Sequence, residues 1–162
     1  MNVEPLLGLP ICEGLNPAEV EVLARTMDVV SCVPHQRIFA RGSEATACFF
    51  VLAGHVDISV PGRGGRAQRI ARLGPGALIG EVALIDGGVR SADGMAGPDG
   101  AHLARLDREA FDQVFRAGNA FAYKLLDVIA GDVTAKLRVA LGEVAAVAAG
   151  GAPIIAPRSH DA

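Results

Sequence analysis

Between Val29 and Leu106 the chain alternates short segments rich in apolar and β-branched residues with clusters of turn-forming residues. The segments are VVSCV, CFFVLAG, HVDISV, RIARL and HLARL, and the clusters between them include RGSEA, PGRGGR and LGPG. Val56, Ile58 and Val60 alternate with polar residues, as in a strand with one buried face. Short strands at regular spacing, separated by turns, are typical of an antiparallel sandwich, roll or jelly roll. This pattern predicts a mainly β region over about residues 29–106.

A helix is predicted before the β region. Asn16 can cap its N-terminus, Pro17 suits the first turn, and Glu19 stands at the capping-box position. Apolar residues then recur at helical spacing as far as Met27. We therefore expect a short amphipathic helix over about residues 17–27.

Two helices are predicted after the β region, over about residues 107–148. Asp107 can cap the first, DREAFDQVF, and the second extends from about Asn119 to Ala148. Apolar residues of the second helix recur at steps of three and four: Leu126, Ile129, Val133, Leu137, Ala140, Val144 and Val147. This stripe either packs on its own domain or pairs with a second chain in a homodimer. Residues 149–162 are typical of a flexible tail, which leaves residues 1–148 as one domain.

The composition argues against several classes of protein. The chain has 162 residues with 15 Lys and Arg, 18 Asp and Glu and a net charge of −3, which is unusual for a nucleic-acid-binding protein. Its three cysteines, Cys12, Cys32 and Cys48, form no CxxC pair and are odd in number, which favours neither a metal site nor a disulfide framework. We find no secretion signal and no apolar stretch long enough to span a bilayer, and therefore expect a cytoplasmic protein that does not bind membranes.

The composition and motifs also give no support for an enzyme. The four histidines, His35, His55, His102 and His160, form no HxH pair that could begin a metal site. We identify no arrangement of nucleophile and base either. The sequence therefore predicts a protein without a metal and without catalytic residues.

The segment from Leu73 to Ala92, LGPGALIGEVALIDGGVRSA, has the residues of a small anion site. Gly80 allows close approach of the backbone, and the following turn of helix offers free N–H groups. Arg90 presents a planar fork of donors that suits two phosphate oxygens. Glu81 is an acceptor for a sugar hydroxyl, so the combination suggests a sugar phosphate. The alternative is a surface loop with an incidental Glu81–Arg90 ion pair.

The segment GEVALIDGGVRSA resembles the phosphate-binding cassette of the cyclic-nucleotide-binding domains. These domains occur in catabolite activator proteins, in the regulatory regions of protein kinases A and G, and in cyclic-nucleotide-gated channels. PICEGLNPAEVEVLA resembles the family's first helix, CFFVLAGHVDI its Gly-marked strand pair, and LARLDREAFDQVF its last strand and following helix. The resemblance covers about residues 10–137 and implies a jelly-roll-like β-roll with an N-terminal helix and long C-terminal helices.

The resemblance also implies a role for each residue of the cassette. Arg90 would bind the cyclic phosphate, and Glu81 would accept from the ribose 2′-hydroxyl. Backbone groups around the sugar and phosphate would come from Gly80, Val82, Ala83 and Ala92. Ser91 would lie beside the phosphate, where it does not discriminate between cAMP and cGMP. For the cap over the base, the last helix offers only candidates, Thr134, Lys136 and Arg138, which are equally consistent with a solvated helix face.

The sequence departs from the family after the cassette. Asp93 places a negative charge near the expected phosphate, and the glycines of Asp93-Gly94 and Gly97-Pro98-Asp99-Gly100 are expected to weaken the strand. These departures leave open an alternative function: a degenerate domain of the same fold that acts in protein interaction or dimerisation without a nucleotide.

The function that the resemblance implies is a regulatory module that binds cAMP or cGMP and relays the change through its C-terminal helix. Only 25 residues follow Leu137, which is too few for a winged DNA-binding unit. We therefore expect no direct contact with nucleic acid, and a separate effector protein as the partner.

Overall fold

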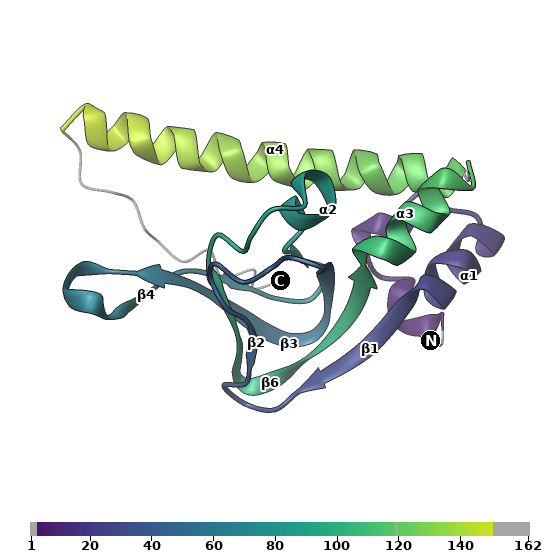
Figure 1. The fold of residues 1–162 in the computed structure, drawn as a ribbon, viewed down its shortest axis with the longest axis horizontal. Helices are drawn as coiled ribbons and strands as arrows, with labels where there is room; N and C mark the ends of the chain where they lie inside the picture. Colours follow the sequence, from purple (N-terminus) through teal and green to yellow (C-terminus); the bar gives the residue numbers. More distant parts are fainter. Residues whose placement is uncertain (1–2, 119, 151–162) are drawn as a thin grey trace.

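The structure, a computed structural model, describes residues 3–118 and 120–150. In this part of the chain, six strands form one antiparallel sheet that is rolled on itself (Figure 1). Strands β1, β6, β3 and β4 follow one another across the sheet, while β2 pairs with β6 and β5 pairs with β3. The strands are β1 (Met27–Cys32), β2 (Arg37–Phe39), β3 (Ala47–Pro61), β4 (Ala67–Leu73), β5 (Leu78–Ile79) and β6 (Asp93–Asp107). The predicted mainly β fold with flanking helices is confirmed.

Helices precede and follow the strands of the roll, and two short ones lie in connections between strands. They are the 3-10 turns η1 (Glu4–Leu6), η2 (Pro10–Cys12) and η3 (Arg63–Gly65) and the α-helices α1 (Pro17–Thr26), α2 (Val82–Asp86), α3 (Arg108–Arg116) and α4 (Ala120–Ala148). In Figure 1 the long α4 runs along one side of the molecule, with α2 and α3 between it and the strands. The C-terminal half of α4 extends beyond α2 and α3, on the side of β4. No helix of the described residues is long and apolar enough to cross a bilayer.

The predicted N-terminal helix is confirmed together with its cap. Asn16 Oδ1 accepts a hydrogen bond from the Glu19 backbone N–H at 3.0 Å, and the Glu19 carboxylate accepts from the Asn16 N–H at 2.9 Å. This reciprocal pair satisfies two N–H groups that the first turn leaves unpaired. The helix ends at Thr26, and β1 follows at once from Met27.

Two segments that we predicted as separate strands, CFFVLAG and HVDISV, form the single strand β3. The register with β6 shifts on both sides of Gly54, whose φ is +74°. A Cβ atom at Gly54 would lie 2.3 Å from the carbonyl oxygen of Gly100, so only glycine fits this bulge. The glycine therefore bends a continuous strand and does not end it.

The glycine-containing stretch after Ala92 was expected to weaken the strand, but it is part of β6, which continues for 15 residues. A Cβ atom at Gly94 would lie 2.5 Å from the ring of Phe39. Gly100 has a φ of +79° and lies against the Cys32 carbonyl oxygen. The glycines let neighbouring groups approach the strand closely, and they do not interrupt it.

The core has two parts on opposite faces of the sheet. In β3, Cys48 and Phe50 face the helices, whereas Phe49 and Val51 face the interior of the roll. This is the two-residue period of a strand that is buried on both faces, which is why CFFV shows no polar alternation. The helix-facing cluster includes Leu6, Ile11, Leu23, Leu106, Phe111, Leu125 and Ile129. The three cysteines are buried and unpaired.

The start of α3 differs from the prediction in its cap. The Asp107 side chain makes no capping hydrogen bond and pairs with Arg105 of the same strand. Phe111 and Val114 are buried, whereas Phe115 is exposed, and its ring lies 5.5 Å from that of Tyr123 on α4.

The apolar stripe of α4 divides into two halves. Ile129 is fully buried, and Leu126 and Val133 pack against the same cluster. From residue 137 onward the apolar side chains are more exposed than buried: Leu137, Leu141, Val144 and Val147. The first half therefore packs on its own domain, and only the second half is free to pair with another chain. Asn119 and residues 151–162 lie outside the described part of the chain.

Candidate functional site

The segment that carries the predicted site runs from β5 through α2 into β6, and a neighbouring loop holds its end in place. The Arg90 carbonyl oxygen accepts from Gly42 N–H at 2.8 Å, and the Arg90 N–H donates to the Ser43 carbonyl oxygen at 2.9 Å. The Asp93 carboxylate accepts from the Arg41 N–H at 3.0 Å. Asp93 therefore caps the neighbouring loop, which gives its charge a local structural role.

The Arg90 side chain lies inside the protein and not on the surface. It is 7% exposed, and its guanidinium donates to the Ala47 carbonyl oxygen at 2.5 Å and to the Gly80 carbonyl oxygen at 3.2 Å. The Arg90 Cζ atom lies 4.5 Å from the centre of the Phe39 ring and 5.8 Å from that of Phe49. Two carbonyl oxygens and two aromatic faces thus orient the guanidinium.

No carboxylate of the described residues forms an ion pair with Arg90. Among these residues the buried Nε of Arg90 also has no hydrogen-bond partner. Burial lowers the pKa of the Arg90 guanidinium, although arginine remains charged in proteins. A buried cation without a direct ion pair is costly, so an anion bound next to it would be favourable.

Glu81 is also buried, and it pairs with a different residue from the one that the loop interpretation suggested. Its carboxylate accepts from Lys136 Nζ on α4 at 2.7 Å. An ion pair between Glu81 and Arg90, which the alternative interpretation required, is absent. The cassette therefore holds a buried carboxylate that is paired with a lysine and a buried guanidinium that is bonded only to carbonyl oxygens.

The remaining predicted site residues surround these two side chains. Gly80 has a φ of +74°, and a Cβ atom there would lie 2.2 Å from Arg90 Nη1, so the close approach that the glycine predicted is to this arginine. Ser91 and Val82 are exposed, and Ala92 is buried. Ala83 lies in α2, but its side chain is outside the described part of the structure.

Two hollows lie near the cassette. A cavity of 330 Å³ includes Arg90, Phe39, Phe49 and Ala47 in its lining, a size in the range of small-ligand sites. A larger one of 930 Å³ lies beside α3 and includes neither Arg90 nor Glu81. Four acidic residues, Glu44, Asp107, Glu109 and Asp112, outnumber the two arginines of its lining, Arg108 and Arg116, and the net negative charge would disfavour an anionic ligand. Among the described residues, no group of three or more His, Cys, Asp or Glu could hold a metal ion.

A profile of the family described as "Cyclic nucleotide-binding domain" matches residues 29–117, which is more than half of the chain. The chain belongs to the cyclic nucleotide-binding domain family. Its fold and the arrangement of its cassette agree with that assignment.

Individual relatives are similar over most of this chain. The "Cyclic AMP receptor protein" of Thermus thermophilus is 32% identical over 123 residues, which cover 76% of this chain and 56% of that protein. A "CRP-like cAMP-activated global transcriptional regulator" of Mycobacterium tuberculosis is 23% identical over 127 residues, 78% of this chain and 56% of that protein. The chain thus spans little more than half the length of these curated relatives.

A solved structure agrees with the fold. The cyclic nucleotide-binding domain from Methylobacillus flagellatus superposes with a TM-score of 0.74 at 26% identity, covering 84% of this chain and 76% of that one.

Sequence reasoning identified the cassette but missed the residues that surround Arg90. Phe39, Phe49 and the Ala47 carbonyl come from strands far away in the chain, and no local spacing marks them. Lys136 was a candidate only for the base cap, with a solvated face as the alternative. In the structure Lys136 has neither role, and its ammonium donates a hydrogen bond to the carboxylate of Glu81.

Proposed function

We propose that this domain, residues 1–148, is a regulatory module that binds a cyclic nucleotide, cAMP or cGMP, at residues 80–92. The observation that carries the proposal is the buried charge of Arg90, which forms no ion pair and whose Nε has no hydrogen-bond partner among the described residues. A cyclic phosphate carries one negative charge and presents exocyclic oxygens to a guanidinium fork. Binding of such a ligand would supply the missing counter-charge.

The other residues of the site have roles that follow from their positions. Glu81 accepts from the ribose 2′-hydroxyl, and Ser91 lies beside the phosphate with its side chain exposed. Backbone groups of Gly80, Val82, Ala83 and Ala92 line the sugar and phosphate. Because Asp93 is bonded to the Arg41 N–H, we expect its charge to interfere less with the ligand than the sequence suggested.

The domain acts by binding and not by catalysis, and it regulates a separate effector protein. Relatives that match it are named as a receptor and a transcriptional regulator. Helix α4 contacts the cassette through Lys136, so a change at the cassette can reach α4 and then the effector. The net charge of −3 and the free cysteines favour a cytoplasmic module that does not contact nucleic acid itself.

Calorimetry with the wild-type chain tests the proposal. We expect cAMP or cGMP to bind with one site per chain, and 5′-AMP, which has the same base and sugar but a dianionic open phosphate, to bind more weakly. If neither cyclic nucleotide binds at millimolar concentration, the proposal is wrong, and the domain is better explained as a protein-interaction module without a nucleotide.

One observation favours an interaction function in addition to nucleotide binding. Leu137, Leu141 and Val144 are each more than half exposed and are spaced four and three residues apart. This is the spacing of a seam between two helices, and in a two-fold dimer the same stripe of both chains would meet. We propose that this half of α4 pairs with its counterpart in a homodimer.

Leu141→Glu is expected to convert the dimer to a monomer without unfolding the domain. The glutamate would be desolvated in the paired seam but solvated in the free chain, where Leu141 is 59% exposed. Sedimentation equilibrium of wild type and variant over a range of concentrations measures the effect. A wild-type chain that stays monomeric at all concentrations rules out the seam.

A further inference from the structure

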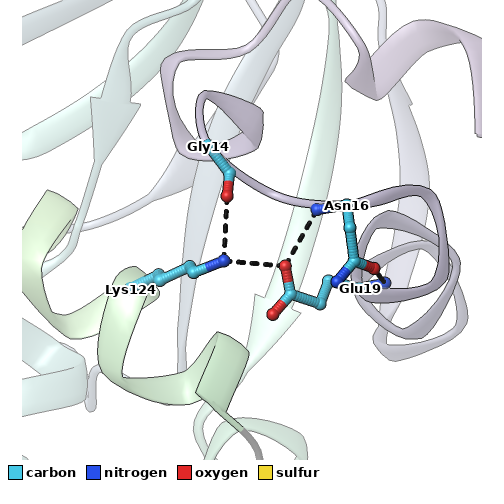
Figure 2. A network of polar contacts seen from close by, with 4 residues as sticks. All are labelled: Gly14, Asn16, Glu19 and Lys124. Carbon is cyan, nitrogen blue, oxygen red and sulfur yellow. Dashed lines mark hydrogen bonds and ion pairs between the residues drawn. The ribbon is translucent and has the colours of Figure 1, made fainter.

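Two lysines of helix α4 form hydrogen bonds with other parts of the domain. Near its start, Lys124 Nζ donates to the Gly14 carbonyl oxygen and to the Glu19 carboxylate, each at 2.8 Å (Figure 2). Twelve residues later, about 18 Å along the helix, Lys136 Nζ donates to the Leu78 carbonyl oxygen at 2.9 Å and to Glu81 at 2.7 Å. The first contact anchors α4 to the cap of α1, and the second to the cassette.

The two anchors differ in what they hold. Glu19 already belongs to the capping box of α1, and the hydrogen bonds from Lys124 and from the Asn16 N–H hold the pKa of its carboxyl below the usual range (Figure 2). That contact is purely structural. Lys136, in contrast, binds the carboxylate that a ribose hydroxyl would need.

The ammonium of Lys136 is bonded to the cassette. Its Nζ donates hydrogen bonds to the oxygens of Leu78 and Glu81, and it forms an ion pair with Asp132 Oδ2 at 2.6 Å, an oxygen that accepts no hydrogen bond from the described residues. The Glu81 side chain is only 5% exposed, so access to its carboxylate is narrow. In agreement with this, neither hollow near the cassette includes Glu81 among the described lining residues.

We propose that Lys136 is a latch, which holds α4 on the cassette in the ligand-free protein and is released when a ligand hydroxyl takes its place on Glu81. The inference rests on the proposed function, because that function assigns Glu81 to the ribose. Release exchanges one donor to Glu81 for another, so the buried carboxylate is not left unpaired. Lys136 also keeps a partner after release, because Asp132 is four residues before it on the same helix.

The latch and simple electrostatic attraction predict opposite changes in cyclic-nucleotide affinity when Lys136 is replaced. Lys136→Met removes the latch and keeps most of the side chain's apolar length. The ligand then no longer displaces an ion pair, so cyclic-nucleotide affinity should rise about three- to fivefold. If Lys136 acted only by attracting the anionic ligand, the same substitution would weaken binding.

Lys124→Met is the matched control, because it breaks an ion pair of the same type on the same helix but away from the cassette. Its affinity for the nucleotide should stay within about twofold of wild type. Calorimetry with the cyclic nucleotide that the wild type binds gives all three affinities.

Hydrogen exchange supplies a readout that does not need the ligand. In the ligand-free Lys136→Met protein, backbone amides of α4 beyond Asp132 should exchange faster than in wild type, and cyclic nucleotide should produce the same increase in the wild type. If the wild type binds nucleotide but Lys136→Met binds equally or more weakly, the latch is wrong and the proposed function stands. If the wild type binds neither nucleotide, the proposed function and the release step both fail. If the α4 amides of ligand-free Lys136→Met exchange as slowly as those of the wild type, Lys136 does not hold α4 on the cassette.

Discussion

Arg90→Ala should weaken the binding of cAMP or cGMP by about 100-fold or more. Two charge-assisted hydrogen bonds to the phosphate contribute roughly 1.5–3 kcal/mol each, and the anion would lose both. The fold should survive, because in the ligand-free protein the guanidinium is bonded only to the carbonyl oxygens of Ala47 and Gly80. Removing it also removes a buried charge that has no counter-ion, which partly offsets the lost contacts.

Calorimetry measures the loss of affinity, and circular dichroism with thermal melting checks the fold. Arg90→Lys is the informative control, because an ammonium keeps the charge but not the planar fork, so it should restore binding only in part. It should also stack less well on Phe39. An Arg90→Ala protein that binds either nucleotide as tightly as wild type would show that the phosphate lies elsewhere.

Ile129→Glu should unfold the domain rather than dissociate a dimer. From the sequence alone this substitution was the natural test of the helix seam, but Ile129 is fully buried within the helix-facing cluster of its own chain. The change removes a large apolar side chain and buries an unpaired carboxylate. Each effect costs several kcal/mol, about 5 kcal/mol or more together, against a total stability of roughly 5–15 kcal/mol.

Thermal unfolding followed by circular dichroism tests this second prediction, with Leu141→Glu as the matched control. Leu141 is on the same helix and receives the same new side chain, but it is exposed, so its variant should stay folded and lose at most the stability that dimerisation contributes. If the Ile129→Glu protein melts at the wild-type temperature, α4 does not pack on the domain as described.

Much of the fold follows from patterns that are local in the chain. The capping box of Asn16 and Glu19 spans three residues, and the structure shows both of its hydrogen bonds. The β-rich region, the two C-terminal helices and the Gly-rich cassette are marked in the same way, by spacing within a few residues. Such features could be predicted because the interactions that form them involve neighbours in the sequence.

Other features depend on what packs against each segment. Gly54 and Gly100 have the residue type of turns, yet they meet across two paired strands and let both continue. Both halves of α4 have the same apolar spacing, but only the first half lies over the core. A hydrophobic pattern shows that a face can be buried and does not say what covers it.

The site shows the same division. Sequence alone determined that Glu81 and Arg90 stand in a Gly-rich segment suited to a sugar phosphate. Only the tertiary structure decided that Arg90 is buried beside Phe39 without a counter-charge, and that Lys136, 55 residues after Glu81, occupies the carboxylate. The reason is physical: residue types set which charges and donors are available, but burial and pairing depend on segments that meet only after the chain has folded.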